Sequence, residues 1–225
     1  MTNSIEQEKA ALSIIEVVLV IIVTFFLAML LGSLMFITID IGLALILTEL
    51  IILFVPLGYM LYKGIDVRRY IGLDINPKLV MLGFVSGIIL LCVDIIVSLV
   101  LLAVFGESQA VIESNNMIAE LSASSWGLVA VATALGLAGI CEEFAFRGFL
   151  QSTLTRRISF IPAVLISSLT FGIFHFDPQL VYILSALSAG LVLGYVYHRW
   201  NSYIVAVIAH SSVNILVLVV LLLGY

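Results

Sequence analysis

Long apolar runs separated by short polar segments dominate the sequence. Several runs approach the length of about 20 residues that an α-helix needs to cross the hydrocarbon core of a membrane. They predict transmembrane helices at Ser13–Ile37, Ile41–Tyr62, Leu79–Phe105, from Trp126 into Glu142 and Glu143, and at Phe160–Phe176, Gln179–Tyr197 and Tyr203–Leu223. The pattern therefore predicts an all-α fold, a polytopic membrane helix bundle of about seven transmembrane helices, in a single membrane domain, 1–225.

The composition agrees with this reading and excludes a soluble protein. Hydrophobic residues make up 63% of the 225 residues and charged residues only 10%, whereas soluble domains are about 45–50% apolar. The net charge of -5 says little, because the positions of the charges matter more than their sum, and no nucleic-acid partner is expected. The oligomeric state cannot be read from the sequence.

The positions of the charged residues predict the orientation in the membrane. Cytoplasmic segments of membrane proteins are enriched in lysine and arginine. If the N-terminus is inside, all nine basic residues fall on the cytoplasmic side, whereas the opposite segment, 106–125, carries only the acidic Glu107, Glu113 and Glu120. We therefore expect the N-terminus inside, the C-terminus outside, and an integral protein of a prokaryotic plasma membrane.

One charged cluster stands at the end of the apolar run that begins at Trp126. Ionisable residues at membrane depth are rare, need partners and indicate a functional site. On a helix, Glu143 and Arg147 are i,i+4 neighbours and can pair, whereas Glu142 points about 100° away. One neutralised and one free glutamate is an arrangement that suits a buried general base.

Two further polar clusters interrupt apolar runs: His175 follows Phe171 by four residues, and His210 precedes Asn214 by four. If the fourth helix continues to a turn near residues 157–159, Glu142 lies about 21 Å before that turn and His175 about 24 Å after it. In an antiparallel hairpin the two side chains would meet at one depth. His210 and Asn214 share a helix face and would join them.

Two more acidic residues lie within the predicted spans outside these clusters. Glu49 and Asp94 could line a polar cavity or could bond to structural partners, and the sequence does not decide their roles. A G-x-x-x-G pair, Gly190 and Gly194, permits close helix contact, and packing is its favoured explanation.

These ordered motifs resemble those of the CAAX protease and bacteriocin-processing (CPBP, or ABI) family of intramembrane endopeptidases, whose Rce1-like members cleave prenylated proteins. The matching residues are Glu142-Glu143-x-x-x-Arg147, Phe171-x-x-x-His175 and His210-x-x-x-Asn214, within 126–216. Residues 1–125 carry no motif and match only in being hydrophobic. The resemblance implies a membrane protein or peptide substrate, with or without a prenyl group. The depths of the polar clusters predict a site reached from the cytoplasmic side.

The chemistry suggests a role for each residue. Amide hydrolysis needs an activated water and a stabilised oxyanion. Glu142 and His175 would activate the water, Glu143 and Arg147 would fix the local charge, and His210 with Asn214 would stabilise the oxyanion. Two histidines and glutamates could instead bind zinc, but no H-E-x-x-H motif is present, and we favour a mechanism without a cofactor.

Two other functions fit parts of the sequence. A proton-coupled transporter could use Glu49, Asp94, Glu142 and Glu143 as a relay, but it would be expected to have paired halves with interrupted helices, which the sequence lacks. A non-catalytic binding or immunity protein could use the same scaffold. Cleavage of a reporter peptide separates the protease from both.

Overall fold

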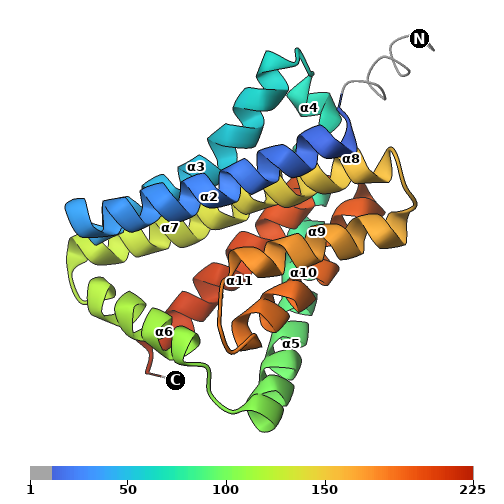
Figure 1. Ribbon diagram of the computed structural model, residues 1–225. Helices are drawn as coiled ribbons and strands as arrows, with labels where there is room; N and C mark the ends of the chain where they lie inside the picture. Colours follow the sequence, from blue (N-terminus) through green and yellow to red (C-terminus); the bar gives the residue numbers. More distant parts are fainter. Residues whose placement is uncertain (1–11, 225) are drawn as a thin grey trace.

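The computed structural model describes residues 12–224 and shows a helical bundle (Figure 1). Within these residues six helices are long and apolar enough to cross a membrane. They are α2 (Ile14–Thr38), α3 (Ile41–Tyr62), α5 (Pro77–Phe105), a continuous helix Ser125–Thr155, α10 (Val181–Trp200) and α11 (Tyr203–Leu222). The predicted polytopic helix bundle is confirmed, and no strand occurs in the described part.

Two predicted elements differ from the structure. The fifth span is shorter than expected, because α9 (Phe160–Phe174) ends before His175 and has only 15 residues. The segment 106–125 was expected to be an acidic loop, but it contains the amphipathic helix α6 (Gln109–Ser122). Its N-cap Ser108 accepts the N–H of Val111, a local interaction that favours a helix start even in a short polar segment.

The fourth helix continues beyond the glutamates, which is necessary if Glu142 and His175 are to lie at one depth. It consists of α7 (Ser125–Glu143), a π-helical segment η1 (Phe144–Gln151) and α8 (Ser152–Thr155). Every residue of η1 is buried, because α2, α3 and α9 pack around it. A π-helical segment is rare and is frequently found at functional sites.

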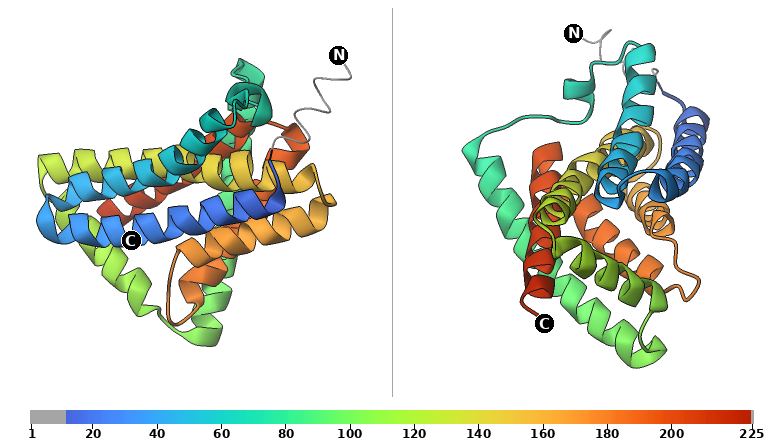
Figure 2. Two further views of the ribbon diagram at one scale, coloured as in Figure 1. Left: turned by 45° about the horizontal axis from the view of Figure 1, so that its top comes forward. Right: turned by 90° about the vertical axis from the view of Figure 1, so that its left-hand side faces the viewer.

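Helix α7 lies at the centre of the bundle. Figure 2 shows α2 and α3 on one side of it, and α11 followed by α5 on the other. Close contact between α7 and α11 depends on Gly139, because a Cβ atom there would clash with Ser211. The hydroxyl of Ser211 donates to the carbonyl of Gly136 at 3.0 Å, so small residues hold these two helices together, as expected for packing in a membrane.

The glycine pair on α10 has the packing role predicted for it. A Cβ atom on Gly190 would press against Ser168 of α9, and one on Gly194 would press against Gln151 of η1. Close approach also exposes backbone acceptors to the neighbouring helix: the carbonyl of Gly194 accepts from the Gln151 side chain at 2.8 Å.

The charged residues agree with the predicted orientation, with one exception. Arg147 lies inside the bundle and is fully buried, so it does not contribute to the charge bias of the loops, and Lys9 lies outside the described residues. The remaining basic residues stay at one end of the bundle, near α4 (Val67–Tyr70), α8 and the turn before α11.

We expect cysteine labelling to confirm this orientation. With Cys92 and Cys141 replaced by alanine, a single cysteine at Glu113 on α6 should react with an impermeant maleimide added to intact cells. One at Arg68 should react only after the cells are opened, because the basic residues hold that end in the cytoplasm. Labelling of both positions from the same side would contradict the topology.

Candidate active site

The site begins at the carboxyl end of α7, where apolar side chains give way to two glutamates. Glu143 is completely buried and Glu142 nearly so, at 9% exposure. Arg147 follows one turn later in η1, and its Nη1 donates to Oε1 of Glu143 at 2.9 Å. The predicted ion pair between these two residues is therefore present.

Arg147 has two further partners that fix its position. Its Nη2 donates to the carbonyl of Gly190 at 3.1 Å, and its guanidinium lies 4.5 Å from the centre of the Phe171 ring. A fully buried guanidinium needs such partners, since an unpaired charge in this environment is costly. The fixed arginine in turn keeps Glu143 in one orientation.

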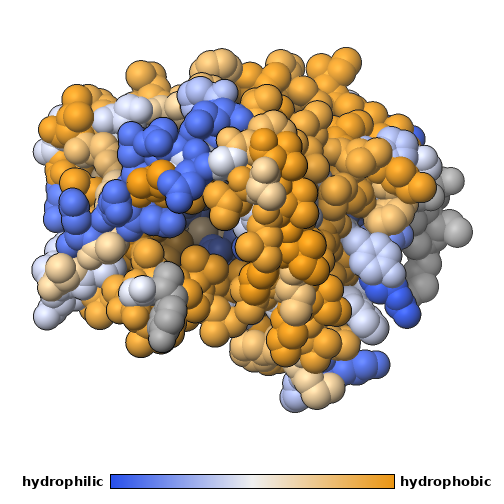
Figure 3. Space-filling model, turned by 90° about the horizontal axis from the view of Figure 1, so that it is seen from below, coloured by the Kyte–Doolittle hydropathy of each residue, from blue (hydrophilic) through white to orange (hydrophobic). Residues whose placement is uncertain are grey.

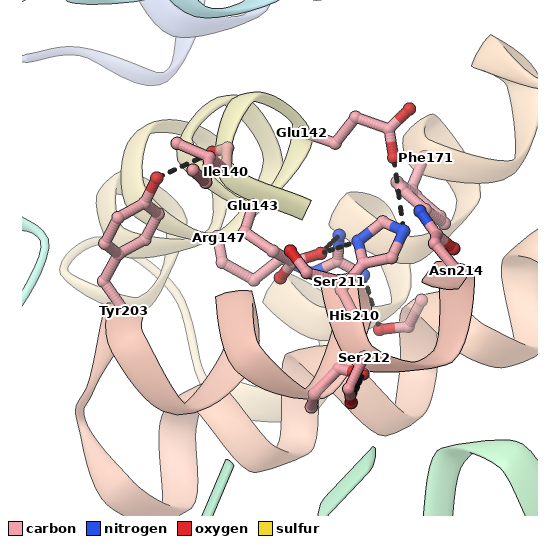
Figure 4. A network of polar contacts seen from close by, with 12 residues as sticks. Ile140, Glu142, Glu143, Arg147, Phe171, Tyr203, His210, Ser211, Ser212 and Asn214 are labelled. Atoms are coloured by element: carbon pink, nitrogen blue, oxygen red, sulfur yellow. Dashed lines mark hydrogen bonds and ion pairs between the residues drawn. The ribbon is translucent and has the colours of Figure 1, made fainter. Parts of the chain in front are cut away.

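His210 of α11 reaches both glutamates. Its Nδ1 lies 2.9 Å from Oε1 of Glu143, and its Nε2 lies 3.6 Å from Oε2 of Glu142 (Figure 4). Because an ionised carboxylate can only accept a hydrogen bond, Nδ1 carries the proton. Nε2 is therefore the nitrogen that faces Glu142, and the four side chains form a continuous series: Arg147, Glu143, His210, Glu142.

His175 is the C-cap residue of α9, and its Nδ1 lies 3.0 Å from the carbonyl oxygen of Phe171. A carbonyl can only accept, so Nδ1 again carries the proton and Nε2 is left as an acceptor. The rings of both His175 and His210 pack against Phe171, with centroid distances of 4.8 and 5.8 Å. No direct contact joins His175 to Glu142 among the described residues.

Asn214 follows His210 by one turn of α11. Its Nδ2 donates to the carbonyl of Leu135 on α7 at 3.2 Å, which uses one of the two amide hydrogens and leaves the other free to bind a substrate oxygen. Closer to the start of α11, the hydroxyl of Tyr203 donates to the carbonyl of Ile140 at 2.6 Å. These bonds to α7 hold α11 in register on both sides of His210.

A cavity of about 560 Å³ adjoins these residues. It lies between α5, α6, α10 and α11, and His175, His210 and Asn214 line its inner part. Figure 3, which views the molecule from the end that carries α6, shows a hollow with hydrophilic residues deep inside a mainly hydrophobic surface. The structure thus brings the two histidines and the asparagine to one cavity, with Oε2 of Glu142 3.6 Å from Nε2 of His210.

The opening of the cavity lies at the α6 end. Glu107, Ser108 and Val111 line it there, and the Ser108 hydroxyl donates to Asp177 in the turn before α10 at 3.1 Å. Burial raises the pKa of Asp177, but the N–H groups of Tyr182 and Gln179 and the Ser108 hydroxyl outweigh this and hold the pKa below its usual range. In the predicted orientation this end faces outside, whereas the sequence predicted access from the cytoplasmic side.

The comparisons with known proteins agree with the motifs. Residues 124–216 match the sequence model of a family described as "Type II CAAX prenyl endopeptidase Rce1-like". These residues belong to the Rce1-like family. No curated protein and no solved structure matches the chain. Membership in the Rce1-like family points to a membrane protease, and all six predicted site residues lie inside the matched segment.

Near this site, sequence reasoning missed one residue, Tyr182, and left the role of a second, Glu49, open. Tyr182 of α10 lines the cavity and packs edge-on against His175, with ring centroids 5.0 Å apart. Glu49 of α3 lies within electrostatic range of Glu142, and its Oε2 is buried without a hydrogen-bond partner among the described residues. As an acidic residue in an apolar run, Glu49 could be recognised in the sequence as a candidate site residue. A tyrosine near a helix start, such as Tyr182, cannot be recognised in this way.

The arrangement does not fit a zinc ion. A catalytic zinc site needs three protein ligands that converge on one point. Among the described residues no group of three histidine, cysteine, aspartate or glutamate side chains is placed to do so. We therefore derive no step that passes through a metal.

Proposed function

We propose that this protein is an intramembrane endopeptidase that hydrolyses peptide bonds of membrane-associated or lipidated substrates. The observation that carries the proposal is the series Arg147, Glu143, His210 and Glu142, in which each contact sets the orientation of the next group. It places a nearly buried carboxylate beside an imidazole with a defined tautomer, which is what general acid–base catalysis requires.

The proposed reaction uses water directly. Glu142, together with Nε2 of His175, holds a water molecule, and Glu142 removes its proton as the oxygen attacks the peptide carbonyl. The carbonyl oxygen becomes an oxyanion that accepts hydrogen bonds from Nε2–H of protonated His210 and from the free amide hydrogen of Asn214. Glu142 then delivers the proton to the leaving nitrogen, the C–N bond breaks, and no acyl-enzyme forms.

Glu143 and Arg147 act without touching the substrate. A carboxylate bonded to Nδ1 of an imidazole fixes its tautomer and stabilises its protonated form. Glu143 does this for His210, and Arg147 pairs with Glu143 within the apolar bundle. Oε1 of Glu143 contacts both Arg147 and His210. Glu143 and Arg147 therefore act together to support His210.

Cleavage of a fluorogenic peptide by the purified, detergent-solubilised protein tests the function. We expect wild type to cleave at one internal bond, Glu142→Gln to serve as the inactive reference, and chelators to leave the rate unchanged. A matched pair of peptides with and without a prenyl group decides whether the lipid is required. Inhibition by chelators that added zinc reverses would overturn the metal-free mechanism. Binding without cleavage would favour the non-catalytic protein.

A further inference from the structure

Asp94 occupies a position that the proposed reaction does not use. It lies within α5, 17 residues after the first residue of that helix, and its half-buried side chain lines the cavity beside α10. It accepts one hydrogen bond, from the hydroxyl of Ser185, at 3.2 Å. No cationic side chain pairs with it in the described part of the chain. A carboxylate at membrane depth without a cation is costly and indicates a function.

Acidic side chains dominate the part of the cavity around Asp94, and the imidazole of His210 at the inner end is offset by Glu142 and Glu143. The charged lining residues of the cavity are Asp94 and Glu107, and among residues 12–224 no lysine or arginine lines it. At the inner end, the Tyr182 hydroxyl lies within electrostatic range of both Asp94 and Glu142. The basic side chains of the loops lie at the other end of the bundle. Because low-dielectric walls strengthen such a field, the cavity attracts cations and repels anions.

Asp94 also lies close to the proposed reaction centre. Its partner Ser185 follows Tyr182 by three residues on α10, an axial rise of about 4.5 Å, and Tyr182 contacts His175. An extended peptide advances about 3.3 Å per residue. A substrate side chain that reaches Asp94 would therefore belong to a residue about one or two positions from the bond that is cleaved.

We propose that Asp94 determines substrate specificity by binding a lysine or arginine side chain of the substrate. That residue would lie next to the peptide bond that Glu142 attacks through water. The inference rests on the proposed function and adds its substrate class: an otherwise apolar segment with one basic residue beside the cleavage point. Ser185 orients the carboxylate, and the apolar part of the cavity accepts the aliphatic stem of the cationic side chain.

Peptide binding to the Glu142→Gln protein tests this without requiring cleavage. Three fluorescent peptides that differ only in lysine, glutamine or glutamate at one position are titrated against the detergent-solubilised protein. We expect the lysine peptide to bind about tenfold or more tightly than the glutamine peptide, as for close charge pairs that lose solvent, and the glutamate peptide to bind least. With Asp94→Asn added, which keeps the shape and the acceptor for Ser185, this preference should disappear.

Two more variants complete the test. Asp94→Lys should reverse the order and favour the glutamate peptide, whereas Glu113→Gln, an exposed change on α6 outside the cavity lining, should leave the preference unchanged. A lysine preference that survives Asp94→Asn would overturn the proposal, and so would an equal loss of affinity for all three peptides. If the wild type cleaved no peptide, the protease assignment would be wrong, but the binding measurements would still test the role of Asp94.

Discussion

Glu142→Gln should lower peptide cleavage by about 10²- to 10⁴-fold, the range that a general base contributes. The amide keeps the size of the carboxylate and can still face Nε2 of His210. In the wild-type protein, Oε2 of Glu142 lies 3.6 Å from that nitrogen. The amide cannot take a proton from water. The loss should appear in kcat, with little change in KM, since the base acts in the transition state.

Two measurements make this result specific. The midpoint of thermal unfolding should stay near that of wild type, because Glu142 accepts no structural hydrogen bond among the described residues. Glu113→Gln is the matched control: it makes the same chemical change on the exposed surface of α6 and should leave the rate unaltered. Undiminished cleavage by Glu142→Gln would remove the proposed base.

Arg147→Ala should destabilise the fold by about 3–5 kcal/mol, the cost of leaving one charge of a buried pair uncompensated. The substitution leaves Glu143 at 0% exposure without its arginine partner and the carbonyl of Gly190 without its donor. Arg147→Lys keeps the charge but loses the planar fork that reaches both partners, so its effect should be smaller. The folded fraction in rising concentrations of sodium dodecyl sulfate measures both.

The control and the rescue use residues of the same chain. Arg199→Ala removes an exposed arginine that lies over Trp200 and should change stability little. Adding Glu143→Gln to Arg147→Ala should recover part of the lost free energy, because the uncompensated charge is then gone. An Arg147→Ala protein as stable as wild type would show that the pair contributes nothing.

Short-range spacing predicted part of this site. The i,i+4 pairs Glu143–Arg147 and His210–Asn214 follow from helical periodicity alone. The similar distances of Glu142 and His175 from one turn depend on a long fourth helix, which the structure contains. Such relations hold within one helix or one hairpin, where the rise per residue fixes the geometry.

Contacts between helices that are distant in sequence were not predictable in the same way. That His210 places Nδ1 on Glu143 and Nε2 toward Glu142 depends on how α11 rotates against α7, which no periodicity determines. The π-helical segment η1 was also missed, because its residues are ordinary helix formers and its geometry depends on the surrounding helices. Asp94 was noticed, but its partner Ser185 on α10 could not be assigned.

The glycine at the contact between α7 and α11 has an evolutionary consequence. Gly139 lies three residues before Glu142, and Ser211 directly follows His210, so the space between these helices sets the distance from the imidazole to both carboxylates. A side chain at 139 would push the helices apart whatever residue occupies 211, because its Cβ would meet the backbone N and Cα of residue 211 at 2.8 and 3.1 Å. We therefore expect related chains to keep glycine at position 139 even where position 211 changes.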